Sequence, residues 1–305
     1  NNRVLLNDIM PGRYEIKTIL KKDFPLLPAV FGQMEKGTPQ NPAVTKESVH
    51  HFSKIVSGSP LVRPAWFFDV AQQGEGIVDV TTHLVDLIQW ECFPDVALDY
   101  KKDIELVAAK RWPTVISPEQ FKGVTKKDTW PEYLKKDVKD GALNVFANGE
   151  IVYRLRGVCA KVSVIWNFEA PAGAGDTHYS IMRGSKANLV IRQGKEQAFK
   201  PTLYVEPVTG VDAGAFEQAL AASLPKITAK YPGIGPTRTA TGTRRTSHRS
   251  PPSTSGSCGT ASSRPGRFRT RSRSTTRRPR RWRWRRRRSS PSAPGRGGKG
   301  TGAKP

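Results

Sequence analysis

Asp79 and His83 are the two residues whose types and spacing best suit chemistry. They stand four positions apart, so a helix that begins at about Ile77 would place both side chains on one face. An imidazole titrates near neutral pH and can exchange a proton with a hydroxyl group, while a carboxylate can bind that hydroxyl or orient the ring. The pair therefore predicts acid/base chemistry on a hydroxyl-bearing substrate.

A purely structural role for the same pair stays open on spacing alone. A helix in which Asp79 stabilises the amino end and His83 makes an ordinary polar contact would show the same pattern. Asp86 and Trp90 extend the polar face of this segment. The other stripe of the helix is apolar and is expected to face the core: Val80, Leu84, Leu87 and Ile88.

The elements that precede this segment are expected to be helical. Prolines interrupt the apolar positions of residues 4 to 30, which predicts short helices there. Thr45 is expected to begin a clearer helix, because Val49, Phe52 and Val56 recur at helical spacing and a Ser-Gly-Ser-Pro stretch would end it.

The sequence offers no pattern typical of a metal site or a disulfide framework. Cys92 and Cys159 are single and widely spaced, and Cys258 lies in the C-terminal tail. His50 and His51 would lie on the helix just described, about 100° apart around its axis, which favours a surface or cleft-rim position over a metal pair. We therefore expect no metal and leave both histidines out of the site.

From Leu98 onward the apolar pattern changes to a period of two, which is typical of strands. One face of residues 161 to 168 is apolar: Val162, Val164, Trp166 and Phe168. Asn148-Gly149 is predicted to be a two-residue hairpin turn, because both positions of a type I′ turn need positive φ. Further strands are expected over these ranges: 103 to 111, 179 to 183, 188 to 192 and 202 to 206.

These patterns predict an α+β fold with an open, mainly antiparallel sheet and helices packed on one of its faces. Consecutive strands without intervening helices favour antiparallel neighbours. A last helix is expected from about Ala213 to Leu224, with Phe216 and Leu220 on its apolar stripe and Pro225 to stop it.

The composition changes near Pro236. The chain carries 50 Lys and Arg against 26 Asp and Glu, a net charge of +24, and residues 236 to 305 hold 21 of the basic residues but no acidic one. The first 235 residues therefore have a net charge of only +3 and are long enough for one large domain. We expect a sheet domain over residues 1 to 235 and a disordered, Arg-rich tail over residues 236 to 305.

Two interpretations of this tail are open. A genuine basic tail could neutralise phosphates, with Trp282 and Trp284 stacking on bases, as in a nucleic-acid-binding protein. We favour the second interpretation, in which the gene is read out of frame. If the codons of residues 240 to 247 are read two bases later, a suitable choice of synonymous codons encodes Tyr-Gly-His-Glu-Ala-His-Phe. The same shift lets residues 263 to 282 encode an amphipathic, protein-like segment. On this second interpretation the tail has no specific nucleic-acid partner.

The sequence does not contain a run of 18 or more apolar residues, so no membrane-spanning segment is expected. It begins with Asn1-Asn2, without Met or a charged and apolar leader, so we expect the true start to lie upstream. Localisation is left open for that reason.

Residues 74 to 86 resemble the second-domain signature of the Gfo/Idh/MocA oxidoreductases, in the pattern Gly-x-Gly-Ile-Val-Asp-x-x-x-His-Leu-x-Asp. Residues 41 to 64 and 181 to 189 are similar to a bacterial subgroup of that family that carries an oxidoreductase C-terminal domain. The resemblance covers nearly all of residues 1 to 235.

The resemblance implies the substrate-binding and oligomerisation domain of an NAD(P)-dependent oxidoreductase that acts on a sugar or cyclitol hydroxyl. It assigns substrate binding to Asp79, an acid/base role to His83, and homo-oligomer contacts to the sheet. NAD or NADP would be bound by an N-terminal Rossmann domain that this chain lacks, since no Gly-x-Gly-x-x-Gly follows a strand here. We therefore expect no cofactor-binding residues and no activity from the fragment alone. A nucleic-acid-binding protein and a noncatalytic assembly domain remain the alternatives.

Overall fold

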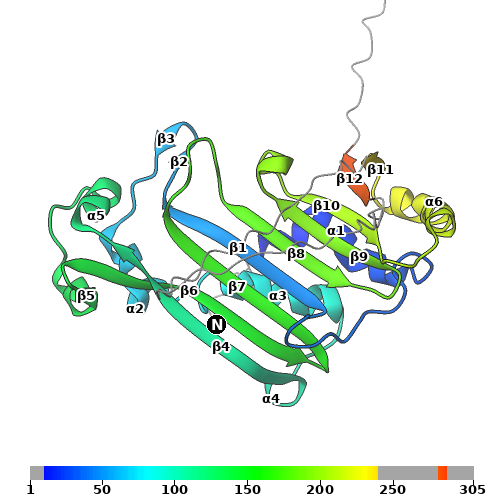
Figure 1. Ribbon diagram of the computed structural model, residues 1–305, viewed down its shortest axis with the longest axis horizontal. Coiled ribbons are helices and arrows are strands. Elements are labelled where there is room, and N and C mark those ends of the chain that lie inside the picture. Colours follow the sequence, from blue (N-terminus) through cyan, green and yellow to red (C-terminus); the bar gives the residue numbers. More distant parts are fainter. Residues whose placement is uncertain (1–9, 240–280, 287–305) are drawn as a thin grey trace, which may run out of the picture.

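The structure is a computed structural model that describes residues 10–239 and 281–286 (Figure 1). Its helices are α1 (Ile16–Asp23), α2 (Val70–Gln73), α3 (Thr81–Cys92), α4 (Tyr100–Asp103), α5 (Pro118–Thr125) and α6 (Ala213–Lys230). Short 3-10 helices occupy Pro11–Tyr14, Phe24–Leu26, Ala65–Phe68, Glu132–Asp137 and Lys195–Gln197. Within the described ranges, no helix is both long and apolar enough to cross a membrane.

The strands are β1 (Val44–Ser53), β2 (Ile55–Val56), β3 (Ser59–Pro60), β4 (Ile104–Ile116), β5 (Val138–Lys139), β6 (Ala142–Leu155), β7 (Val158–Glu169), β8 (Thr177–Arg183), β9 (Ala187–Gln193), β10 (Thr202–Pro207), β11 (Ile234–Thr239) and β12 (Arg281–Arg286). The main sheet has the order β11-β12-β10-β9-β8-β1-β7-β6-β4, and β5 pairs with β6. Every pair in it is antiparallel except β1 with β7. The predicted α+β fold with an open, mainly antiparallel sheet is confirmed.

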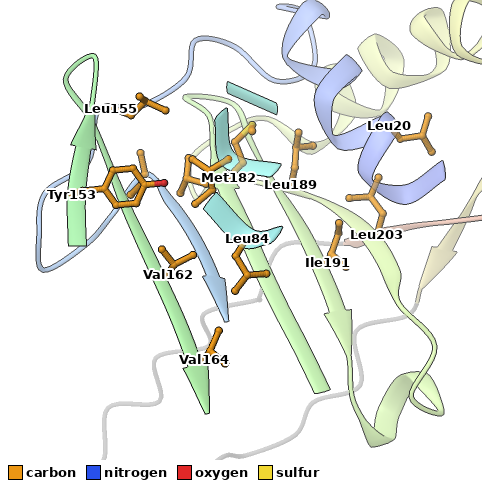
Figure 2. Close-up of a cluster of buried hydrophobic side chains, with 14 of the residues drawn as sticks. Leu20, Leu84, Tyr153, Leu155, Val162, Val164, Met182, Leu189, Ile191 and Leu203 are labelled. Carbon is orange, nitrogen blue, oxygen red and sulfur yellow. The ribbon is translucent and has the colours of Figure 1, made fainter. Parts of the chain in front are cut away.

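One face of the sheet carries the core. Figure 1 shows α1 and α3 together behind the strands, while the face toward the viewer is open in the described part of the chain. Alternate side chains of the strands, such as Val162, Val164 and Met182, point to the helix side and are fully buried. Leu84 of α3 lies among these side chains, and Leu20 of α1 lies beside Leu203 of β10 (Figure 2). The apolar residues that recur at every second position of these strands therefore lie on the face that the helices cover.

The predicted hairpin turn at Asn148-Gly149 is wrong. Strand β6 runs through both residues, and the turn to β7 lies at Arg156-Gly157, whose φ values are 49° and 83°. That site meets the same requirement for positive φ, which glycine adopts readily. Asn148 instead accepts a hydrogen bond from the Trp166 N–H through its Oδ1 at 2.7 Å. Its amide side chain thus helps to join strands rather than to form a turn.

The predicted helix from Thr45 is also wrong, because this segment is β1, in the middle of the sheet. Strand β1 pairs with β7 along one edge and with β8 along the other. β-branched residues such as Val49 and aromatic residues such as Phe52 suit a strand, and pairing along both edges outweighs their helical spacing. His50 and His51 therefore leave a strand on opposite sides.

The last helix extends further than predicted. Helix α6 runs through Pro225 to Lys230, although the proline removes one backbone N–H from the helix. Ile227, beyond the proline, is buried, and Lys230 Nζ donates to Asp23 Oδ2 at 2.7 Å. These tertiary contacts outweigh the local effect of the proline.

Strands β11 and β12 bring part of the Arg-rich tail to the edge of the sheet. Of the tail that we expect to be disordered, residues 236–239 and 281–286 instead form strands, and the rest lies outside the described residues. Trp284 packs edge-on against Phe24, with ring centroids 5.2 Å apart. Its Nε1 is buried and has no hydrogen-bond partner among the described residues.

Candidate active site

The loop that carries Asp79 crosses strand β6 at close range. The Gly76 N–H donates to the Phe146 carbonyl at 3.1 Å, and a Cβ placed on Gly76 would lie 2.3 Å from Ala147 O. Thr81 Oγ1 donates to the Gly76 carbonyl at 2.6 Å, which ties the start of α3 to this crossing. Glycine alone fits here, and the crossing fixes the point from which Asp79 projects.

The Asp79 side chain is half-buried, and its Oδ1 accepts a hydrogen bond from Gln73 Nε2 at 3.2 Å. Burial raises the pKa of its carboxyl, against the opposing effects of that hydrogen bond and of the nearby His50, His83 and Arg63. A partly desolvated carboxylate among such groups can accept a strong, charge-assisted hydrogen bond from a ligand hydroxyl.

His83 lies in the first turn of α3, because the helix begins at Thr81 and not near Ile77 as predicted. Its ring is exposed, and its Nδ1 lies 3.3 Å from Met10 Sδ. Asp79 therefore belongs to the turn before the helix, while remaining close enough to interact with His83 electrostatically. Asp79 and His83 are near one another, but the turn and the helix position them separately.

A cavity of about 300 Å³ lies between the first turns of α1 and α3 and the helix-covered face of the sheet. This volume is at the lower end of the range for small-molecule sites. The α3 side of its wall is apolar, with Val80, Leu84 and Leu87, whereas the α1 side carries Glu15, Lys17 and Thr18. Its sheet-side wall is polar apart from Ile191: Lys46, Ser48, His50, Asp176, Thr177, His178 and Gln193. We call it the α1–α3 cavity.

A larger cavity of about 520 Å³ lies between α1, β10 and β12. Among the described residues that line it, there is no His, Asp or Glu. Acid/base chemistry and hydroxyl binding need such groups, so the smaller α1–α3 cavity is the better candidate despite its size.

His50 and Asp176 form the most connected polar pair of the α1–α3 cavity. Because a carboxylate only accepts hydrogen bonds, His50 Nδ1 donates to Asp176 Oδ2 at 3.3 Å, and its Nε2 accepts from the Ser48 hydroxyl at 3.0 Å. Although burial opposes it, hydrogen bonds from His50, Lys54 and His51 lower the pKa of Asp176 below its ordinary range. The ionised carboxylate therefore holds the His50 ring toward Ser48.

His178 lines the same cavity from strand β8. Burial, and then the positive charges of Lys46, Lys21 and Lys17, lower its pKa to about 3. The ring is therefore neutral at pH 7, so that one of its nitrogens can donate a hydrogen bond to a ligand and the other can accept one.

Sequence reasoning missed Lys46, His50, Asp176 and His178 as candidate site residues. A strand assignment for residues 44–53 would have placed Lys46, Ser48 and His50 on one face at a period of two, which was the available signal. Asp176 follows a Gly-rich loop and directly precedes β8, where no local pattern marks it.

Residues 10–239 and 281–286 do not contain three or more His, Cys, Asp or Glu side chains grouped to hold a metal ion. A dinucleotide phosphate site needs a glycine-rich turn between a parallel strand and a helix. Gly74-Glu75-Gly76 instead joins α2 to the turn before α3, so these described residues do not fit a nicotinamide dinucleotide.

Comparison with known proteins places the chain among oxidoreductase domains. Residues 20–247 match the family described as "Putative oxidoreductase C terminal domain". A search of the curated proteins found no match. Among solved structures, one described as a putative oxidoreductase from Parabacteroides merdae is 58% identical with a TM-score of 0.74, over 77% of this chain and 53% of that one.

Two further solved structures are more distant. One from Thermotoga maritima is 16% identical with a TM-score of 0.36, over 72% of this chain and 53% of its own. One from Erwinia carotovora atroseptica is 12% identical with a TM-score of 0.41, over 72% of this chain and 56% of its own. This chain therefore spans about half the length of the solved structures that it matches.

Proposed function

Because this chain belongs to the family of oxidoreductase C-terminal domains of the Gfo/Idh/MocA type, we propose that it binds the substrate of an NAD(P)-dependent oxidoreductase acting on a sugar or cyclitol hydroxyl. The observation that supports this most directly is the position of Asp79. It directly precedes Val80 in the wall of the α1–α3 cavity and interacts with His50 in the opposite wall. A half-buried carboxylate at the edge of a polar cavity suits a substrate with several hydroxyls.

In this proposal Asp79 accepts a hydrogen bond from one substrate hydroxyl and so orients the ring or chain of the substrate. His83 takes the proton of the hydroxyl whose carbon is oxidised, or returns it in the reverse direction, because an imidazole changes charge near neutral pH. Its exposed ring is available to a substrate held at the surface of this domain.

NAD or NADP would supply the hydride chemistry from a separate Rossmann domain. The support for this assignment is the poor fit of the described residues to a dinucleotide, together with the 53% of the Parabacteroides merdae chain that this chain covers. Calorimetric titration of NAD or NADP into this chain alone should show no tight binding.

We also propose that copies of the domain associate through the open face of the sheet. Ile181, Val190 and Tyr204 form a small buried apolar cluster that is separate from the main core, with Tyr179 packed against it. Since Met182 points to the helix-covered side, Ile181 next to it in β8 points to the open side. Tyr179, which packs against this cluster, is only partly buried, so its ring is available to a second copy of the domain.

The roles of Asp79 and His83 can be tested in an enzyme of this family in which the domain is joined to its cofactor domain. His83→Ala should lower kcat about a hundredfold or more and leave cofactor affinity nearly unchanged, as expected for lost proton transfer. Asp79→Asn should mainly raise KM, because the amide loses the charge-assisted hydrogen bond. Lys139→Ala, on exposed strand β5, is the control. Normal rates in both site variants would refute the proposed roles.

A further inference from the structure

Three charged side chains are fully buried behind the α1–α3 cavity: Lys21 of α1, Lys46 of β1 and Glu91 of α3. Lys46 Nζ lies 2.7 Å from Glu91 Oε1, and Lys21 Nζ lies 3.6 Å from Glu91 Oε2. Two ammonium groups thus share one carboxylate, and with both lysines protonated the cluster has an unbalanced positive charge. An unbalanced charge in the interior is strongly unfavourable.

The groups around this Lys-Glu-Lys cluster do not supply a second negative charge. The Ser180 hydroxyl accepts a hydrogen bond from Lys21 Nζ and lies 3.5 Å from Lys46 Nζ, but it is neutral. Burial raises the pKa of Cys92 to about 12, so its thiol is neutral as well. Within the described residues, Glu91 is the one carboxylate that pairs with either lysine.

The positive charge of the cluster reaches the α1–α3 cavity. Lys46 forms part of the cavity wall, and His178 lines the same wall. After burial itself, Lys46, Lys21 and Lys17 are the charges that most lower the pKa of His178. The polar end of the cavity therefore combines a positive field with a neutral imidazole that can donate an N–H.

The carboxylates in the cavity lining are already paired. Asp176 accepts hydrogen bonds from His50 and Lys54, the latter at 2.5 Å. Glu15 Oε2 lies 2.7 Å from Lys17 Nζ, which lines the cavity with it. Neither carboxylate offsets the charge of the cluster, so a ligand anion could do so.

We propose that the substrate is a polyhydroxylated acid, such as a hexuronate or an aldonate, whose carboxylate binds between Lys46 and His178 while its hydroxyls extend toward Asp79. This inference rests on the proposed function of the same site. One carboxylate adds a single negative charge, which balances the cluster once Lys21 is protonated. A phosphate would bring nearly two at pH 7. Moreover, arginine matches phosphate geometry best, and no arginine is among the described residues of the lining.

The test is calorimetric titration of three acids and three neutral counterparts into the whole chain at pH 7.5. The pairs are D-glucuronate with D-glucose, D-galacturonate with D-galactose, and D-gluconate with D-glucitol. At least one acid should bind ten or more times as tightly as its counterpart. Neutral compounds that bind as tightly as their acids would overturn the inference and leave the proposed function standing. Failure of all six to bind would overturn both.

Proton uptake gives a second measurement in the same titrations. A bound carboxylate would raise the pKa of Lys21, whose surroundings are Glu91, Lys46, Cys92 and the Ser180 hydroxyl. Lys21 should then take up a proton, so the binding enthalpy should change with the ionisation enthalpy of the buffer. An enthalpy that does not depend on the buffer would contradict the proposed link between ligand and cluster.

Two variants locate the carboxylate site. Lys46→Met should remove the preference for the acid, while Lys139→Met, which alters an exposed lysine, should keep it. His178→Gln leaves the buried charges in place and covers the case in which Lys46→Met does not fold. It should weaken binding of the acid several-fold and change binding of the neutral counterpart little. A preserved preference in folded variants of both residues would overturn the assignment.

Discussion

Gly76 and Gly149 meet where the loop before α3 crosses β6, and neither position has room for a side chain. A Cβ on Gly76 would lie 2.3 Å from Ala147 O, and one on Gly149 would lie 2.4 Å from Ile77 Cγ1. Gly76→Ala must therefore push the loop away from β6 and move Asp79 with it. We expect it to lower the free energy of unfolding by about 1–3 kcal/mol, measured by urea denaturation.

Gly123→Ala is the matched control for this prediction. Gly123 lies within helix α5, and a Cβ placed on it would have nothing within 4 Å. Alanine is the better helix former, so this variant should be as stable as the wild type or up to about 1 kcal/mol more stable. Equal stability of Gly76→Ala and Gly123→Ala would show that the crossing can relax without cost.

Buried Lys21 predicts a stability that rises with pH in the alkaline range. Burial is the main cause that lowers its pKa to about 7 from 10.5. Between these two values the unfolded chain binds a proton that the folded chain does not, so the free energy of unfolding increases with pH there. The full shift corresponds to at most about 5 kcal/mol.

Lys21→Met should reduce this increase when unfolding is measured at pH 7 and at pH 10. Lys139→Met, an exposed lysine on β5, should leave it unchanged. If Lys21→Met shows the same rise in unfolding free energy as the wild type, the group responsible for the pH dependence must be another one.

Asp176→Asn should destabilise the protein at pH 7 and have less effect in acid. The carboxylate accepts hydrogen bonds from His50, His51 and Lys54, and these hold its pKa below the ordinary range against the effect of burial. Because the side chain is partly exposed to solvent, we expect a loss of about 1–2 kcal/mol. Its contribution is present above the unfolded-state pKa of about 4 and is lost as the pH falls through the folded-state value.

Urea denaturation at pH 7 and pH 3 checks this prediction. Asp128→Asn is the control, because Asp128 is fully exposed although it pairs with Lys122 at 2.7 Å. That variant should have the stability of the wild type at both pH values. A loss for Asp176→Asn that does not shrink in acid would point to a role of its shape rather than its charge.

Tyr179→Glu should weaken the association that we propose for the open face of the sheet. Tyr179 packs on the apolar cluster of that face, and a carboxylate there would meet its own copy or an apolar surface across the interface. Light scattering after size exclusion should give a lower mass than for the wild type at equal concentration. Tyr133→Glu, at an exposed tyrosine in the 3-10 helix Glu132–Asp137, should not change the mass. A monomeric wild type would contradict the proposal outright.

Strands that use one face for the core could be predicted from the sequence. Val162, Val164 and Trp166 alternate with more polar residues because helices cover one side of β7 and not the other. Strand β1 could not be predicted in this way, because its core-facing side carries Lys46, Ser48 and His50 among apolar residues. A strand with polar groups on its buried side loses the alternation that identifies strands.

Only some residues of the candidate site could be predicted from the sequence, for a related reason. Asp79 and His83 are four positions apart, so one local segment carries their signal. Asp176 and His178 join His50 from more than 120 positions away, through strand pairing that no local pattern specifies. The turn at Arg156-Gly157 could not be predicted either, because Asn148-Gly149 has the more typical turn sequence. Gly149 is instead needed where the loop before α3 packs closely on β6.

Strand β1 has a further consequence for how the protein is made. Its two neighbours in the sheet, β7 and β8, end only at Glu169 and Arg183. About 130 more residues must therefore be synthesised after β1 before both of its edges can be paired. At about 5–20 residues per second, the ribosome needs roughly 6 to 26 s to synthesise these residues. An unpaired strand of this length is an aggregation hazard, and charged or polar side chains along it act as gatekeepers. We therefore expect Lys46, Ser48 and His50, which line the α1–α3 cavity in the folded protein, also to limit aggregation of the nascent chain.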